Sequence, residues 1–206
     1  MKTIIRLLGG VLIWCLSFAA YGQPLSDLIQ TWEKANFQLE GDAQKVAFDS
    51  LLEKAAVLRE DHDQSAAHML WAGIIEASYA GEIGGLSALG HAKQAKKDFE
   101  AALELDSASV KAAALGSLAA LYSKVPGWPI GFGNAKKARA LFEQAENEGA
   151  NSLDFYVMYA EFALDQNDTM LARRLLEKAE MVPTRPDRQI TDAARHEERR
   201  ALTDKL

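Results

Sequence analysis

The sequence predicts an all-α protein built as a solenoid of helical hairpins, and two observations favour this fold class. An Ala-apolar-Ala set with offsets of four and seven residues places its three side chains on one face of an α-helix. The set occurs three times, as Ala95-Phe99-Ala102, Ala138-Phe142-Ala145 and Ala172-Leu176-Ala179. The copies begin 43 and 34 residues apart, a period typical of stacked repeats, which usually present interaction surfaces rather than reaction centres.

The N-terminal 22 residues have the pattern of an export signal. Lys2 and Arg6 precede an apolar run over residues 7–20, and small residues frame a cleavage site before Gln23. The run is shorter than the ~20 apolar residues that span a bilayer. We therefore expect residues 1–22 to be a cleaved signal peptide and residues 23–206 to form one periplasmic domain, with secretion as the second choice.

Removal of this segment leaves an acidic chain without cysteine. The only cysteine, Cys15, lies inside the signal, so neither a disulfide nor thiol chemistry is expected. The formal net charge of −6 becomes more negative when Lys2 and Arg6 are lost. An acidic chain has no electrostatic reason to bind nucleic acid or anionic lipid, and we expect no stable membrane insertion after cleavage.

The units are clearest at the C-terminal end of the repeats. Ser152–Leu164 is predicted to be a first helix, residues 166–168 a turn, and Thr169–Val182 a second helix stopped by Pro183. This pair resembles the tetratricopeptide repeat, in which a large residue followed by Gly or Ala marks the first helix and an Ala-aromatic-Ala set the second. The chain matches those slots three times, as Trp71-Ala72 with Ala95-Phe99-Ala102, Leu115-Gly116 with Ala138-Phe142-Ala145, and Tyr159-Ala160 with Ala172-Leu176-Ala179.

The resemblance implies three recognisable units, at about 65–107, 109–150 and 152–184, with further helices at both ends. Upstream, at about 24–62, Leu25–Phe37 and Val46–Leu58 are predicted to pair around a turn at residues 41–42, as a degenerate first unit or cap. Downstream, within 186–206, Thr191–Leu206 is predicted to be a charged capping helix that starts at Thr191 or Asp192.

Two units contain glycine-rich insertions between their helices, 11 and 10 residues longer than the connection in the last unit. Because glycine breaks helices, we expect loops at 81–92 and 124–134 that project from one end of the stack. Long-looped periplasmic repeats of this kind are similar to the T-component of TRAP-type solute transporters, which works beside an extracytoplasmic solute-binding protein.

Trp128 and Phe132, in the second loop, are the candidate binding residues. Exposed aromatic side chains anchor protein interfaces well. The alternative, which we favour because large apolar side chains are normally buried, is that both rings fold back into their own stack.

Five arginines near the C-terminus have two interpretations. They form a solvated helix face with local pairs such as Asp192 with Arg195 or Arg199, or a docking patch for an acidic partner; the first is favoured. The arginines are Arg185, Arg188, Arg195, Arg199 and Arg200.

No catalytic, metal or cofactor site is expected. The triplet at 61–63 and His68 can bind metal, but charged residues in a turn are usually solvated. The segment His196-Glu197-Glu198 lacks the second histidine of a zinc-protease helix, and neither a nucleophile elbow nor a phosphate-binding loop is present.

We therefore expect a non-enzymatic periplasmic scaffold or adaptor that binds an unidentified protein or peptide on its helical-repeat surface. An accessory small-solute-binding protein, with a cavity closed by the inserted loops, is the alternative. The third option is an envelope scaffold without a discrete ligand.

Overall fold

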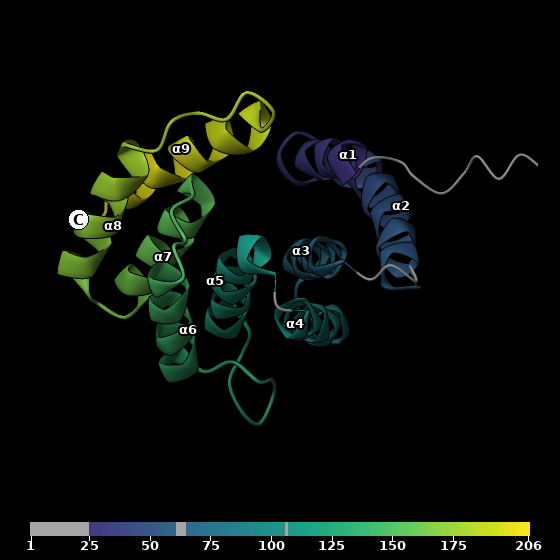
Figure 1. The fold of residues 1–206 in the computed structure, drawn as a ribbon, viewed down its shortest axis with the longest axis horizontal. Coiled ribbons are helices and arrows are strands. Elements are labelled where there is room, and N and C mark those ends of the chain that lie inside the picture. Colours follow the sequence, from purple (N-terminus) through teal and green to yellow (C-terminus); the bar gives the residue numbers. More distant parts are fainter. Residues whose placement is uncertain (1–24, 61–64, 106) are drawn as a thin grey trace, which may run out of the picture.

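The computed structural model describes residues 25–60, 65–105 and 107–206, which form an all-helical fold (Figure 1). The signal-peptide prediction, Cys15 and the triplet at 61–63 lie outside these residues. Within them no strand occurs, and no helix is long and apolar enough to cross a membrane. The helices are α1 (Leu25–Phe37), α2 (Gly41–Glu60), α3 (Ala66–Ile83), α4 (Ala88–Glu104), α5 (Ala108–Lys124), α6 (Ala135–Asn147), α7 (Leu153–Asp165), α8 (Thr169–Glu180) and α9 (Gln189–Thr203).

Consecutive helices pair as hairpins, and the odd-numbered helices contact one another in order. Figure 1 shows α3, α5 and α7 towards the inside of an arc, with α2, α4, α6 and α8 outside them. The last helix, α9, packs on α7 and α8 and also contacts α1, so the arc closes on itself. The predicted C-terminal cap therefore joins the two ends of the described chain rather than covering one of them.

Side-chain caps define the starts of several helices. Asn134 and Ser152 each accept a hydrogen bond from a backbone N–H in the first turn of α6 and α7, at 2.9 and 3.1 Å.

Two predicted helix starts are wrong. Gly41, at φ 58°, begins α2 directly instead of forming a turn before Val46, and α9 begins at Gln189 rather than Thr191.

The first insertion is not the loop predicted at 81–92. α3 continues through Ile83 and α4 begins at Ala88, which leaves only residues 84–87 between them. Gly84 and Gly85, at φ 57° and 64°, make this short turn. The other two glycines of the insertion lie inside the helices, where the packing of α3 on α4 outweighs their low helix propensity. The second insertion does form a loop, over residues 125–134.

The residues predicted to pack the repeats are all buried. Phe142 stacks on Tyr159 with ring centroids 4.6 Å apart, and a Cβ on Gly73 would lie 2.6 Å from the Phe99 ring. Small residues therefore let neighbouring helices approach closely. The buried set is Trp71, Ala72, Ala95, Phe99, Ala102, Leu115, Gly116, Ala138, Phe142, Ala145, Tyr159, Ala160, Ala172, Leu176 and Ala179.

Local pairs do form on α9, Arg195 with Glu198 and Arg200 with Glu197, but not the two predicted for Asp192. The five arginines are also not a free docking patch, because four of them are partly buried. Asp192 is buried and pairs with Arg185, not with Arg195 or Arg199. Arg185 and Arg195 both bind the carboxylate of Asp154 on α7, at 2.8 and 3.1 Å. These ion pairs lie within the chain and fasten the segment around α9 to the rest of the fold.

Acid should weaken this attachment. Burial opposes the charge on Asp154, but Arg195 and Arg185 outweigh it and hold the pKa of this carboxyl below its ordinary value of 3.8. A carboxyl whose pKa is lowered by folding contributes stability above its unfolded-state pKa and loses it as pH falls through the folded value. We expect the free energy of unfolding to decrease below about pH 4, and Asp154→Asn to flatten that decrease. Urea unfolding across acidic pH measures both curves, and identical slopes would contradict this role of Asp154.

Candidate interaction surfaces

The loop over residues 125–134 has a defined path. The N–H groups of Ile130 and Gly131 donate to the carbonyl of Gly127, each at 3.1 Å, and Gly133 donates to Pro126 at 2.9 Å. A Cβ on Gly133 would lie 1.7 Å from the carbonyl oxygen of Val125, so only glycine fits there. The loop is therefore held by its own backbone.

The two aromatic residues of this loop lie in different surroundings. Phe132 is half-buried and packs edge-on against Tyr122 of α5, with ring centroids 5.4 Å apart. Trp128 is 90% exposed. The favoured interpretation, that both rings fold back, is therefore wrong for Trp128. Phe132 anchors the loop, while Trp128 is accessible to a ligand.

The turn between α3 and α4 lies beside this loop. A Cβ on Gly131 would be 3.4 Å from the side chain of Leu89, at the start of α4. Leu86, in the turn, is 77% exposed, and Ile130 is 58% exposed. We call the exposed side chains of Leu86, Trp128 and Ile130 the apolar tip. Of these three residues only Trp128 was predicted from the sequence, because the tip forms only where the two segments meet.

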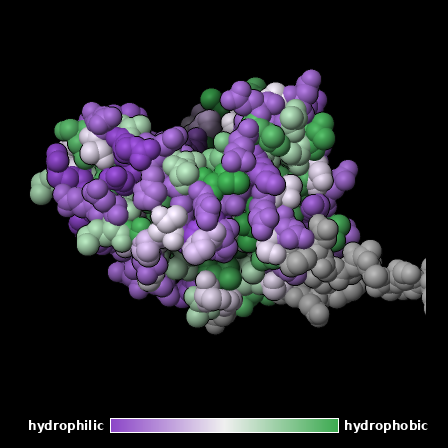
Figure 2. Space-filling view, turned by 90° about the horizontal axis from the view of Figure 1, so that it is seen from above, coloured by the Kyte–Doolittle hydropathy of each residue, from purple (hydrophilic) through white to green (hydrophobic). Residues whose placement is uncertain are grey.

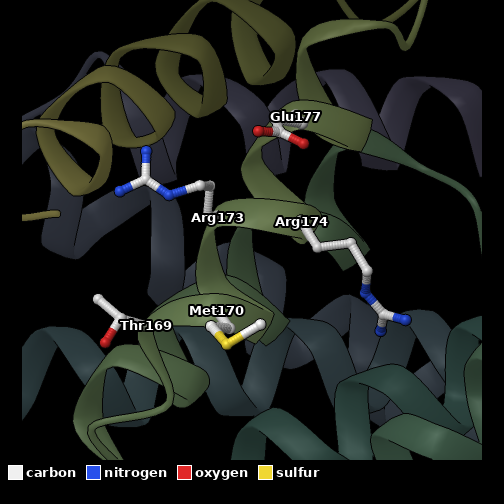
Figure 3. Close-up of a pocket in the computed structure, with 5 residues that line it drawn as sticks. All are labelled: Thr169, Met170, Arg173, Arg174 and Glu177. Atoms are coloured by element: carbon white, nitrogen blue, oxygen red, sulfur yellow. The ribbon is translucent and has the colours of Figure 1, made fainter.

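A second exposed surface is an open groove between α6 and α8, with a volume of about 610 Å³. Figure 3 shows the adjoining hollow of about 290 Å³, where Arg173 and Arg174 point to opposite sides of α8 and Met170 lies between them. Seen from above, the α8 and α9 side of the surface is mostly hydrophilic (Figure 2). The groove is lined by Arg139, Glu143, Glu146, Asn147, Tyr159, Asp168, Met170, Leu171 and Arg174.

The groove combines exposed ion pairs, whose partners a ligand can replace, with an exposed apolar side chain. Arg139 pairs with Asp168 at 3.1 Å, and Arg174 with Glu146 at 3.4 Å. These pairs are at least partly exposed, and exposed ion pairs contribute little stability, so a ligand's charges can replace either partner. Met170 is 86% exposed. The groove could not be predicted from the sequence, because its residues come from different units.

The groove includes one tyrosine whose pKa is shifted. Tyr159 lies at its buried floor, where burial, with the charge of Glu143, raises the pKa of the phenol to about 12. A phenol with such a pKa stays neutral at ordinary pH. Within the described ranges, no three His, Cys, Asp or Glu side chains come together as a potential metal site.

A cluster of titratable side chains between α2, α3 and α4 was not predicted from the sequence. Arg59 donates hydrogen bonds to Glu76 and Asp98, each at 2.7 Å, and His91 contacts the second oxygen of Glu76, also at 2.7 Å. Both carboxylates are buried and partnered. This cluster joins α2 to the next hairpin, and its residues are too far apart in sequence to form a local motif.

The fold and the two surfaces define a class: an all-α protein of consecutive helical hairpins with an open groove and a protruding apolar tip. No family model matches the chain. No curated protein sequence matches it either.

Proposed function

We propose that this chain is a non-enzymatic, periplasmic protein of tetratricopeptide-repeat type that binds a protein or peptide on its helical surface. The consecutive pairs α3–α4, α5–α6 and α7–α8 support this proposal, as does the burial of the small and aromatic residues that the repeat pattern places at its helix contacts. Export of the chain rests on the pattern of residues 1–22 and stays a prediction.

The observation that carries the proposal is the open groove between α6 and α8. It presents both signs of charge around the exposed thioether of Met170. Methionine adapts to varied apolar partners because its side chain is unbranched and flexible. A peptide with an apolar side chain between charged ones suits this surface.

The small-solute alternative required a cavity closed by two inserted loops. The first insertion is largely helical, and the two hollows described above lie along α8, away from both insertions. The geometry therefore favours a macromolecular ligand over an enclosed small molecule.

Met170→Glu should prevent retention of the partner, because it places a new charge at the apolar centre of the groove. Tagged protein is used to capture partners from a periplasmic extract, and the retained proteins are quantified by mass spectrometry. We expect at least one specific protein to decrease about tenfold or more. Met181→Glu is the matched control, because Met181 is 85% exposed at the end of α8 but does not line the groove. If both variants retain the same proteins as the wild type, the groove is not the binding site.

A further inference from the structure

We propose that the apolar tip docks on an anionic lipid surface, with Leu86, Trp128 and Ile130 entering the headgroup region and nearby lysines contacting lipid phosphates. This inference goes beyond the proposed function, because none of the residues that line the α6–α8 groove belongs to the tip. It assigns a second binding surface to the same chain.

The shape and composition of the tip suit a bilayer interface. The three side chains protrude, with exposures of 58% to 90%, and neither of the two hollows described above includes them. Tryptophan favours the headgroup region, where its ring is partly apolar and its N–H stays hydrated. Because backbone hydrogen bonds and Phe132 already fix the loop, little conformational freedom is lost on docking.

Lysines lie on the two helices that flank the loop. Leu89, which contacts the loop, shares a face of α4 with Lys93 and Lys96. Lys96 lies over the Phe132 ring, with its Nζ 5.9 Å from the ring centroid. Two more lysines, Lys136 and Lys137, lie in the first turn of α6, directly after the loop. We call Lys93, Lys96, Lys97, Lys136 and Lys137 the lysine rim.

Most of this rim is available to a ligand. Lys93, Lys97 and Lys136 are exposed, and no residue in the described part of the chain forms an ion pair with them. Lys96 pairs with Glu100 at 3.2 Å, and Glu82, at the end of α3, is the exposed acidic residue nearest the turn in sequence. Positive charge therefore predominates around the tip.

The net charge of the chain conceals this arrangement. The negative net charge predicted no attraction to anionic lipid. Charges farther from the lipid surface than the Debye length of about 8 Å are, however, largely screened at physiological salt. A membrane surface responds to the charges closest to it, and the helices that flank the tip carry the lysine rim. Apolar insertion and lysine attraction together give the two signals that stable peripheral binding requires.

Vesicle sedimentation tests the proposal. Purified protein is mixed with vesicles of phosphatidylcholine alone or with about one third phosphatidylglycerol. We expect binding to the anionic vesicles, weakening as salt is raised, and a blue shift of tryptophan fluorescence in the wild type. Trp128→Ala should weaken binding about tenfold or more and remove most of the shift, and Lys93→Glu with Lys136→Glu should weaken binding similarly.

Two matched controls separate the tip from general surface effects. Met181→Ala removes an exposed apolar side chain elsewhere, and Lys45→Glu reverses an exposed lysine on α2; both should bind as the wild type does. Every variant carries the same N-terminus, so differences between them report the tip. Absence of vesicle binding, or equal binding by Trp128→Ala and the wild type, would overturn the proposal, and the first outcome would assign the tip to a protein partner. Met170→Glu should bind vesicles normally, which separates failure here from failure of the groove.

Discussion

Replacing Phe142 by alanine should lower the free energy of unfolding by about 3–5 kcal/mol. The side chain has no exposed surface and lies on α6 against α7. Its ring stacks on Tyr159 at an interplanar angle of 7°, and it also contacts Phe155 and Phe162, with centroids 6.1 and 5.4 Å away. Alanine would leave a cavity among three rings that cannot easily move into it, because all three are fixed on α7 and buried.

Urea or thermal unfolding measures this loss, with Phe132→Ala as the matched control. That substitution removes the same ring from a half-buried site at the foot of the loop, where water can fill the space. It should therefore cost clearly less. If the two variants unfolded at the same denaturant concentration, the aromatic cluster around Phe142 would not be the main contact between the α5–α6 and α7–α8 hairpins.

The helices and their packed faces could be predicted from sequence because the signals are local. Ala138, Phe142 and Ala145 share a helix face by spacing alone, and all three are buried. The first insertion was predicted to be a loop but is largely helical, for a physical reason. Gly81 and Gly90 each weaken a helix by about 1 kcal/mol relative to alanine, which the contact between α3 and α4 can outweigh.

The candidate surfaces were less predictable because they depend on segments distant in sequence. Composition drew attention to Trp128, but its exposure depends on the path of the loop, which backbone hydrogen bonds fix. The lysine rim combines residues from α4 and α6, which only the fold places around one tip. The groove likewise needs α6 and α8, which belong to different units, to lie side by side.

The contact that closes the arc, between α1 and α9, depends on a buried carboxylate. Glu33 is 2% exposed and accepts hydrogen bonds from Arg188 at 2.9 Å and from the hydroxyl of Thr191 at 2.5 Å. The Arg188 guanidinium also lies over the rings of Trp32 and Trp71, 5.8 and 5.3 Å from their centroids. One arginine at the start of α9 therefore contacts both α1 and α3.

Arg188→Ala should lower the free energy of unfolding by about 3–5 kcal/mol, because it leaves the Glu33 carboxylate buried without its counter-ion. The double variant Glu33→Leu with Arg188→Met should recover most of that loss, since apolar side chains of similar size replace the whole pair. Urea unfolding of both variants measures the difference. Equal instability of the single and double variants would show that the packing of Arg188 on the two tryptophans, rather than its charge, holds α9 against α1. Recovery in the double variant would instead show that most of the loss comes from the unpaired carboxylate, so that the ends of the arc can close through apolar contact alone.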